Sequence, residues 1–236
     1  MRMSYQSIFK RYEIKYLITE EQKKRLLKVM EPYMKIDKYG KTNIRNIYFD
    51  TDTYELIRKS IEKPMYKEKL RVRSYGCPGK DSDVFVELKK KCDGIVYKRR
   101  LSLPDEKAKK AFLSHESLPI NSQIAREIDY FRNYYDTLKP VVFLSYDREA
   151  YFTLIESDLR ITFDSNIFSR LNDFNLNSDV YGYPVLPAEM SIMEIKTSSA
   201  IPIWLAGFLS EEKIYKTSFS KYGATYQKYI MNYTEA

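Results

Sequence analysis

The sequence predicts an α+β fold, an antiparallel β-barrel with helices packed on its outside. Apolar and polar residues alternate with a period of two in about eight segments of the chain. Short turn-like segments, GCPGKDS and CDG, join three of them, which favours antiparallel pairing. Closure into a barrel would remove the exposed edges of a sheet with so many strands.

The elements are expected in the following order. A strand at 5–18 ends at Thr19, which caps a helix with glutamates in its first turn. Further strands are expected at 44–50, 66–75, 83–91, 94–103, 141–152, 159–164 and 188–198. Helices are expected at 53–62, around 104–113 and 121–138, and in the C-terminal region, where Trp204 and Leu205 pack. Residues 172–179, rich in Asn and Asp, predict a loop. No long linker interrupts the pattern, so we expect a single domain, 1–236.

Composition narrows the classes of function. The net charge is +8, which suits a polyanionic partner or a well-solvated basic surface. No segment approaches the ~20 apolar residues of a membrane span. No signal peptide is recognisable, and Cys77 and Cys92 lack metal-type spacing, so we expect a reduced, cytoplasmic protein with inert cysteines. The one histidine, His115, follows a predicted helix, which argues against a catalytic triad and a histidine metal site. With seven glycines and no glycine-rich phosphate loop, side chains would have to bind any phosphate.

Charged residues fall on one face of each predicted strand. In 66–75, Lys69, Arg71 and Arg73 lie opposite Leu70 and Val72. The polar faces of the strands carry Arg11, Lys15, Lys69, Arg71, Arg73, Lys89, Lys91, Lys98, Arg100, Arg160 and Lys196, with the lone glutamates Glu13, Glu87 and Glu194. Arg148 instead shares parity with Leu144 and Tyr146. A water-facing sheet would mix both signs with Ser, Thr and Gln. The excess of cations therefore favours polar faces that line the barrel interior.

A barrel interior lined by these cations predicts the kind of ligand that it binds. Concentrated like charge destabilises an empty fold unless anions neutralise it. Arginine forks match phosphate oxygens, and lysines add mobile positive charge. Carboxylates in the same place would repel phosphate unless they held a divalent cation, and Mg²⁺ and Mn²⁺ commonly bridge carboxylate and phosphate oxygens. The pattern therefore predicts a linear, metal-bound polyphosphate.

Nine segments in order resemble a known family: RYEIKY, RNIYFDT, KLRVRSYG, FVELKKK, YKRRLSL, SYDREAY, LRITFD, MEIKTS and SFSKYGATY. They resemble the VTC domain, the polyphosphate polymerase domain of the vacuolar transporter chaperone complex, of which bacteria carry stand-alone versions. The family belongs to the triphosphate tunnel metalloenzymes, alongside the CYTH proteins. The resemblance implies an eight-stranded antiparallel barrel, the triphosphate tunnel. It also implies transfer of the γ-phosphate of ATP to a growing polyphosphate chain, with release of ADP.

The resemblance also implies roles for individual residues. The family's basic tunnel residues match Lys15, Arg71, Arg73, Lys89, Lys98, Arg148, Arg160 and Lys221, and its metal-binding glutamate matches Glu194. We expect catalytic roles for Arg71, Arg73, Lys89, Arg148, Arg160 and Lys221. We expect substrate binding by Arg11, Lys15, Lys69, Lys91, Lys98, Arg100 and Lys196, and binding of Mn²⁺ or Mg²⁺ by Glu194, Glu13 and Glu87.

Two departures from the wider superfamily matter. Its hydrolytic members begin with ExExK, whereas this chain has Arg11 at the first glutamate position. That loss of a metal-binding carboxylate favours a polymerase over a CYTH-type triphosphatase. The phosphate-sensing domain and the membrane helices of the eukaryotic proteins are not recognisable here, so vacuolar translocation and inositol-phosphate control are not expected.

Three alternatives remain open at this stage. A triphosphatase acting on inorganic or nucleoside triphosphate would share nearly every residue. A non-catalytic polyphosphate-binding module, serving a membrane-protein partner, would bind without ATP turnover. A nucleic-acid binder would need exposed aromatic residues among its cations. We do not expect this last class, because Tyr12 and Tyr97 fall on the apolar faces, where core packing is expected.

Overall fold

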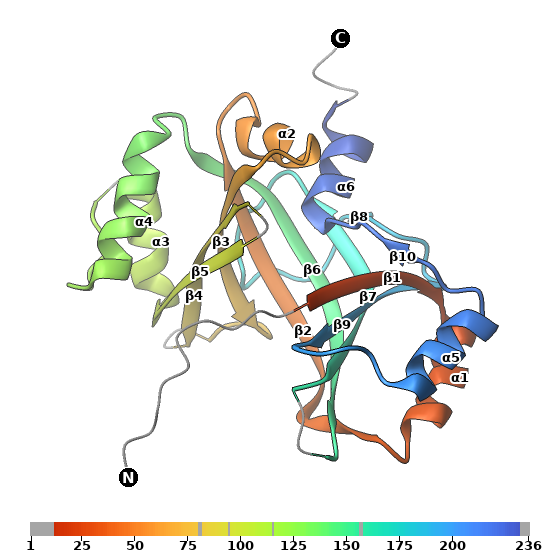
Figure 1. The fold of residues 1–236 in the computed structure, drawn as a ribbon. Helices are drawn as coiled ribbons and strands as arrows, with labels where there is room; N and C mark the ends of the chain where they lie inside the picture. The colour runs from red at the N-terminus through yellow and green to blue at the C-terminus, as the bar shows by residue number, and fades with distance from the viewer. Residues whose placement is uncertain (1–11, 80–81, 94, 115, 156–157, 232–236) are drawn as a thin grey trace. The chain divides into compact units, whose positions relative to one another are not determined.

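The computed structural model describes residues 12–79, 82–93, 95–114, 116–155 and 158–231 (Figure 1). It confirms the predicted α+β fold of an antiparallel sheet with helices. Contacts divide the chain into two compact units. Unit 1 comprises Met1–Thr42, Asp147–Asn166 and Leu186–Phe219, and unit 2 comprises Asn43–Tyr146, Ile167–Val185 and Ser220–Ala236. The single domain 1–236 stays a prediction.

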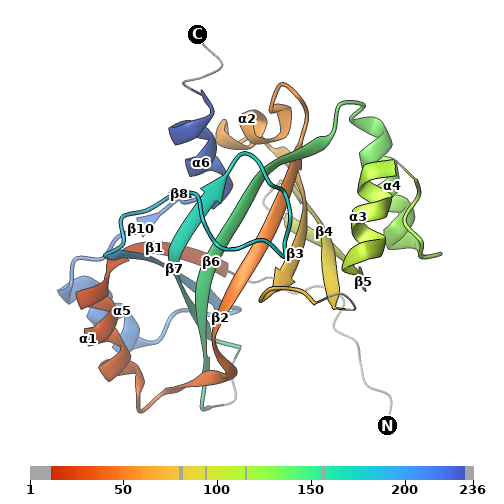
Figure 2. The ribbon, with the colours of Figure 1, turned by 180° about the vertical axis from the view of Figure 1, so that it is seen from behind.

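Unit 1 is built on strand β1 (Tyr12–Thr19), which pairs antiparallel with β9 (Met190–Thr197) and with the two-residue strand β10 (Lys216–Thr217). The Arg160–Asp164 part of β7 (Arg160–Arg170) pairs with the other edge of β9. Helices α1 (Glu20–Met30) and α5 (Ile203–Glu211) lie side by side in both views (Figures 1 and 2). They share a buried apolar core that includes Ile18, Leu26, Ile195 and Leu205.

The sequence explains where helix α1 begins. The Thr19 side chain accepts a hydrogen bond from the Gln22 backbone N–H at 3.1 Å, and the Gln22 side chain accepts one from the Thr19 N–H at 3.0 Å. This capping box satisfies two of the N–H groups that the first helical turn leaves without a partner. Glu20 and Glu21 add negative charge where the helix dipole is positive. The end of β1 is thereby fixed in space.

Unit 2 contains the predicted three-stranded meander, β3 (Tyr66–Tyr75), β4 (Asp83–Cys92) and β5 (Ile95–Pro104). The part of β2 (Met34–Asp50) from Ile44 to Phe49 pairs with β3, and β8 (Tyr183–Pro184) pairs with β7. Its helices are α2 (Glu55–Ile61), α3 (Asp105–Ser114), α4 (Gln123–Tyr134) and α6 (Lys221–Tyr229). The remaining long strand, β6 (Lys139–Thr153), is divided between the units, with 139–146 in unit 2.

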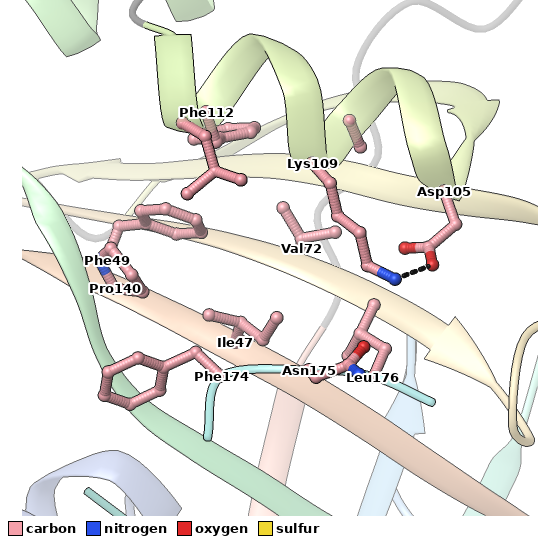
Figure 3. Close-up of a pocket in the computed structure, with 12 residues that line it drawn as sticks. Ile47, Phe49, Val72, Asp105, Lys109, Phe112, Pro140, Phe174, Asn175 and Leu176 are labelled. Carbon is pink, nitrogen blue, oxygen red and sulfur yellow. Dashed lines mark ion pairs between the residues drawn. The ribbon is translucent and has the colours of Figure 1, made fainter. Parts of the chain in front are cut away.

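The apolar face of the meander packs against α3 and α4 (Figure 1). Val84, Val86 and Leu88 alternate along β4 and are fully buried, as their parity predicts. A cavity of about 300 Å³ remains on this face, lined by Ile47, Phe49 and other apolar side chains, with a Lys109–Asp105 ion pair of 2.7 Å at its margin (Figure 3). Its apolar lining makes it unlike a phosphate site.

The sheet agrees with the predicted barrel-like fold in all but its closure. Its hydrogen-bonding order is β10-β1-β9-β7-β6-β2-β3-β4-β5, with β8 beside β7, so within the described residues it is not closed. Period-two alternation defines the two faces of a strand and carries no information about the partner of an edge strand, so it could not test closure. The prediction also missed the first ten residues of β2, MKIDKYGKTN, because they are mostly polar and lack alternation.

Two smaller expectations were wrong. Tyr12 is 49% exposed and Tyr97 is 48% exposed, so neither is a core residue. On β5, Leu101 and Leu103 belong to the buried cluster, whereas Ile95 and Tyr97 do not, so only the second half of that strand is covered. Among the described residues, no helix is long and apolar enough to span a bilayer. Cys77 and Cys92 are free and exposed, and His115 lies outside the described residues.

Candidate phosphate and metal sites

The polar face of the unit 2 sheet brings predicted site residues into register. Arg71 lies directly opposite Glu87, which lies opposite Arg100 on the next strand. Two residues along, Lys69, Lys89 and Lys98 form a second row. Directly opposed residues of antiparallel strands project from the same face, so the sheet gathers these six side chains on one surface.

Glu87 is the centre of this group. Its side chain is 2% exposed, and its Oε2 accepts hydrogen bonds from Arg71 Nε at 2.8 Å and Arg71 Nη2 at 2.6 Å. Lys98 Nζ lies 2.7 Å from Oε1, Arg100 Nε 3.5 Å from Oε1, and Arg73 Nη1 4.0 Å from Oε2. We call Glu87 with these four cations the Glu87 cluster.

The charges of the Glu87 cluster stabilise one another. Burial alone would raise the pKa of the Glu87 carboxyl, but Arg71, Arg73 and Lys98 outweigh it and lower the pKa to about 2. The carboxylate therefore stays ionised and compensates part of the positive charge. Its predicted role as a metal ligand stays a prediction, and the salt bridges give it a second role as the internal counter-ion of the arginines.

Polar side chains of neighbouring strands orient the two arginines. Arg71 Nη1 donates to the Tyr48 hydroxyl at 3.0 Å, and Tyr48 is the cross-strand partner of Arg71. Arg73, almost fully buried, donates from Nε to Asn46 Oδ1 at 2.9 Å and from Nη2 to the Tyr146 hydroxyl at 3.2 Å. Such fixed guanidinium groups are preorganised donors for an anion.

Tyr48 responds strongly to the surrounding cations. Burial would raise the pKa of its phenol, but Arg71, Arg73 and Lys69 lower it to about 8. The lowering of this pKa in spite of burial reflects the positive potential of the three surrounding cations. That potential is the property that a phosphate site requires.

Helix α6 presents the predicted lysine Lys221 to the same unit. The helix begins at Lys221, with Ser220 as N-cap accepting from the Gly223 N–H at 3.2 Å. Lys69 Nζ donates to the Ser220 hydroxyl at 3.2 Å, and Lys221 Nζ lies 4.4 Å from the centre of the Tyr146 ring. The start of the helix is thus connected to β3 and β6 through polar and cation–π contacts.

In unit 1, a second group surrounds Glu194. Lys15 on β1 and Thr162 on β7 flank Glu194 in register on β9. Lys196 Nζ lies 2.6 Å from Glu194 Oε1, whereas Lys15 Nζ lies 3.8 Å from Oε2 and 3.5 Å from Glu13 Oε1. We call Glu13, Lys15, Glu194 and Lys196 the Glu194 cluster. Burial acts to raise the pKa of Glu194, but Lys196, Lys15 and Arg148 together hold it far below its ordinary value.

Arg148 and Arg160, both predicted, also belong to unit 1. Arg148 on β6 makes a two-bond fork with Asp164 on β7, with Nε–Oδ1 of 2.6 Å and Nη2–Oδ2 of 2.7 Å. Asp164 is fully buried, so the fork fixes the guanidinium plane. Arg160 lies opposite Lys196 and packs over the Phe152 ring, 4.7 Å from its centre.

The Glu194 cluster fits a divalent cation that is shared with phosphate. Glu194 Oε2 has only a long contact with Lys15, at 3.8 Å. Thr162 is the cross-strand partner of Glu194, and its buried hydroxyl has no hydrogen-bond partner in the described part of the chain. Within the described ranges no three His, Cys, Asp or Glu side chains are placed to hold a metal unaided. Mg²⁺ is often bound by one or two carboxylates with substrate phosphates supplying other ligands, and these residues suit that mode.

Not every predicted residue joins these groups. Lys91 lies opposite Lys67 on β3, one row beyond Lys69 and Lys89. Arg11, the departure from ExExK, lies outside the described residues.

Three supporting residues were missed by the sequence interpretation. Asp164 shares strand parity with Arg160 and Thr162, so parity could have found it. Tyr48 is linked to the site only by its pairing with Arg71, which parity within one strand does not reveal. Asp50, also fully buried, accepts from the Leu56 and Ile57 N–H groups of α2 and from the Tyr222 hydroxyl at 2.8 Å. No sequence pattern pairs Asp50 with a residue so far along the chain.

Comparison with known proteins identifies the fold and the family. A putative adenylate cyclase from Bacillus halodurans is 19% identical, with 92% of this chain and 96% of that chain covered and a TM-score of 0.57. A putative adenylyl cyclase from Hippeastrum, described as revealing a dominant triphosphatase activity, is 17% identical, with 92% and 95% covered and a TM-score of 0.56. These likenesses show the fold alone, and curated proteins give no match. The family model of the VTC domain matches residues 10–230, nearly the whole chain. The chain therefore belongs to the VTC domain family.

Proposed function

We propose that the protein is a polyphosphate polymerase that transfers the γ-phosphate of ATP to the end of a polyphosphate chain. Membership of the VTC domain family supports this, because the sequence resembles the polymerase domain of that family. The observation that carries the proposal is the Glu87 cluster, in which one buried carboxylate organises four cations on a single sheet face. Four positive charges around one negative charge leave a net positive site for phosphate oxygens.

Phosphoryl transfer depends mainly on position and charge neutralisation. Arg71 and Arg73 are already oriented by Glu87, Tyr48, Asn46 and Tyr146, so little reorganisation is needed when phosphates bind. Lys98 and Arg100 are more exposed and would bind oxygens at the open side of the cluster. We assign to this cluster the clamping of the triphosphate.

In unit 1, we assign Glu194, assisted by Glu13, to hold Mn²⁺ or Mg²⁺, and Lys15, Lys196, Arg148 and Arg160 to bind phosphate oxygens. A bound divalent cation would neutralise developing charge on the phosphate oxygens. Both carboxylates lie within 4 Å of the Lys15 ammonium group, which pairs with them in this structure. Asp164 keeps Arg148 in one orientation by its two-bond fork.

The proposed reaction needs no histidine. The terminal phosphate of a polyphosphate chain is anionic near neutral pH and can act as nucleophile without a general base. The new P–O bond to the γ-phosphorus forms as the bond to the β-γ bridging oxygen breaks, and ADP leaves with that electron pair. The cations of the site stabilise the negative charge during this exchange.

A triphosphatase is the second candidate. The Hippeastrum protein of similar fold is described as having a dominant triphosphatase activity. The same clamp would serve hydrolysis, with water in place of the polyphosphate end. The two candidates differ in product, because hydrolysis gives free phosphate and the polymerase gives a longer chain.

The direct test incubates purified protein with ATP and either Mn²⁺ or Mg²⁺ and measures ADP, free phosphate and polyphosphate on a stained gel. We expect ADP together with a polyphosphate ladder, and loss of both with a chelator or in Glu194→Gln. Equal amounts of ADP and free phosphate without a ladder would favour the triphosphatase. Tight polyphosphate binding without ADP would favour a non-catalytic binding module.

A further inference from the structure

The first turn of helix α6 contacts both tyrosines that orient arginines of the Glu87 cluster. The hydroxyls of Tyr48 and Tyr146 each accept a hydrogen bond from one of these arginines. The Tyr222 ring stacks on the Tyr48 ring with centres 5.0 Å apart, and Lys221 Nζ lies 4.4 Å from the centre of the Tyr146 ring. Consecutive residues of α6 therefore pack against both of the supporting tyrosines.

Tyr222 has a second anchor in Asp50, at the end of β2. The Tyr222 hydroxyl donates to Asp50 Oδ2 at 2.8 Å, and both side chains are buried. Tyr48 and Asp50 are two residues apart on β2, so their side chains project from the same face of that strand. The Tyr222 side chain contacts both of them. These separate contacts fix the rotation of the helix as well as its distance from the strand.

The Asp50 carboxylate is itself held in one orientation. Its Oδ1 accepts from the N–H groups of Thr51 and Leu56, each at 2.8 Å, and its Oδ2 accepts from the Ile57 N–H at 2.9 Å. These backbone donors fix the carboxylate relative to β2 and α2, so the acceptor that Tyr222 uses has a set position. Loss of the Tyr222 hydroxyl would leave a buried acceptor without one of its donors.

Lys221 depends on this anchor for its place beside the proposed phosphate site. Its neighbour Ser220 accepts from Lys69 Nζ at 3.2 Å, and Lys69 projects from the same face of β3 as Arg71. The turn therefore meets the polar face on which the Glu87 cluster lies. A lysine is a point charge on a long flexible stem, so the side chain cannot fix its own position. The backbone of the turn has to do so.

We propose that Tyr222 is a positioning residue for phosphate binding, which uses its anchors Asp50 and Tyr48 to hold the first turn of α6 so that the Lys221 ammonium group stays at the phosphate site. The inference rests on the proposed function and deepens it, because it assigns the residue that keeps a predicted lysine of that site in place. Tyr222 is buried and acts through Lys221, without contact to the ligand. Its effect on binding should therefore disappear when the lysine is absent.

The test is a double-mutant cycle in binding, without ATP or turnover. Dissociation constants for inorganic triphosphate are determined by calorimetry for the wild-type chain, Tyr222→Phe, Lys221→Gln and the double variant. Thermal unfolding verifies that each variant is folded, and Asp50→Asn replaces Tyr222→Phe in the cycle if the latter is not.

The matched control is Tyr135→Phe. It also removes a hydroxyl donor from a buried carboxylate, because the Tyr135 hydroxyl donates to Glu68 Oε2 at 3.2 Å. Glu68 projects from the opposite face of β3 to the one that carries the Glu87 cluster. The control therefore separates a general loss of stability from a loss of position at the phosphate site.

We expect Lys221→Gln to weaken triphosphate binding at least about tenfold, because a charge-assisted contact is lost. Tyr222→Phe should weaken it about three- to tenfold, because the lysine remains but is no longer preorganised. In the Lys221→Gln background the same change should cost less than about twofold, since residues that act together are not additive. Tyr135→Phe should lose stability and keep its triphosphate affinity within about twofold of the wild-type value.

Hydrogen exchange of the ligand-free wild-type chain tests the anchor without any substitution. The Gly223 and Ala224 amides, which donate to Ser220, should exchange far more slowly than in an open chain. Exchange at the rate of an open chain would overturn the anchor.

An unchanged affinity in Tyr222→Phe, equal losses with and without Lys221, or the same loss in Tyr135→Phe would also overturn the role of Tyr222. Because ATP is absent, a coupled cycle in a protein that makes no polyphosphate would refute the proposed polymerase and leave this role intact. An uncoupled cycle in a protein that does make polyphosphate would refute the role of Tyr222 alone.

Discussion

Replacing Glu87 by Gln tests whether one carboxylate supports the arrangement of four cations. The change keeps the shape of the side chain and removes its charge, leaving Arg71 and Lys98 without the partner they contact at 2.6 and 2.7 Å. Because Glu87 is 2% exposed, water cannot replace it. Breaking a buried ion pair by removing one partner costs about 3–5 kcal/mol, and partial exposure of the cations favours the lower end.

The lowered pKa of Glu87 leads to a similar value for its contribution to the free energy of unfolding. The surrounding cations lower the pKa of its carboxyl from 4.5 to about 2. Each tenfold change in proton affinity is worth about 1.4 kcal/mol, so the ionised carboxylate contributes about 3 kcal/mol. A depressed carboxyl pKa stabilises the folded state above the unfolded pKa. This contribution is therefore fully present above about pH 4.5 and is lost as the pH falls toward 2.

The assay is urea unfolding of the wild-type chain and Glu87→Gln across this pH range. We expect the free energy of unfolding of Glu87→Gln to be lower than that of the wild-type chain by about 3 kcal/mol at neutral pH. This difference should become smaller as the pH approaches 2. Glu127→Gln is the control, because Glu127 also contacts an arginine at 2.7 Å but at the surface, where about 1 kcal/mol or less is expected. If Glu87→Gln loses no more stability than Glu127→Gln, or its loss does not depend on pH, the role given to Glu87 is wrong.

Three further substitutions test other parts of the molecule. Asp164→Asn weakens the fork that fixes Arg148, and we expect kcat for ATP to fall roughly 10²-fold; steady-state kinetics with an unchanged kcat would exclude a positioning role. Tyr222→Phe removes a donor from the buried Asp50, and urea unfolding should show a loss of about 1–3 kcal/mol; a fully stable variant would mean that water replaces the hydroxyl. Arg71→Gln removes a preorganised donor and should lower ATP turnover at least about 10²-fold, whereas turnover within the wild-type range would remove Arg71 from the clamp.

Strand parity predicted the face of nearly every described site residue. Arg71 and Glu87 are flanked by apolar residues and Arg100 precedes Leu101, and the structure places the three in one row. This succeeded because the period of a strand is fixed by backbone geometry, and because the covered face is strongly apolar. The short turns between β3, β4 and β5 left little choice of partner, so the meander also followed from the sequence.

Contacts between distant segments could not be predicted in this way. Asp50 and Tyr222 meet through helix packing, and no local periodicity relates them. The polar first half of β2 has no apolar pattern of its own, so propensity did not reveal it. The ends of the sheet posed the same difficulty, because faces can be assigned from alternation and edge partners cannot.

The fate of the γ-phosphate tests the central claim most directly. ATP labelled with radioactive phosphorus at the γ-position is incubated with the protein, a divalent cation and an unlabelled polyphosphate primer, and the products are separated by size. The proposed polymerase predicts label in chains longer than the primer, with one ADP formed for each phosphate added. Label found only in free phosphate, with the primer unchanged in length, would contradict it.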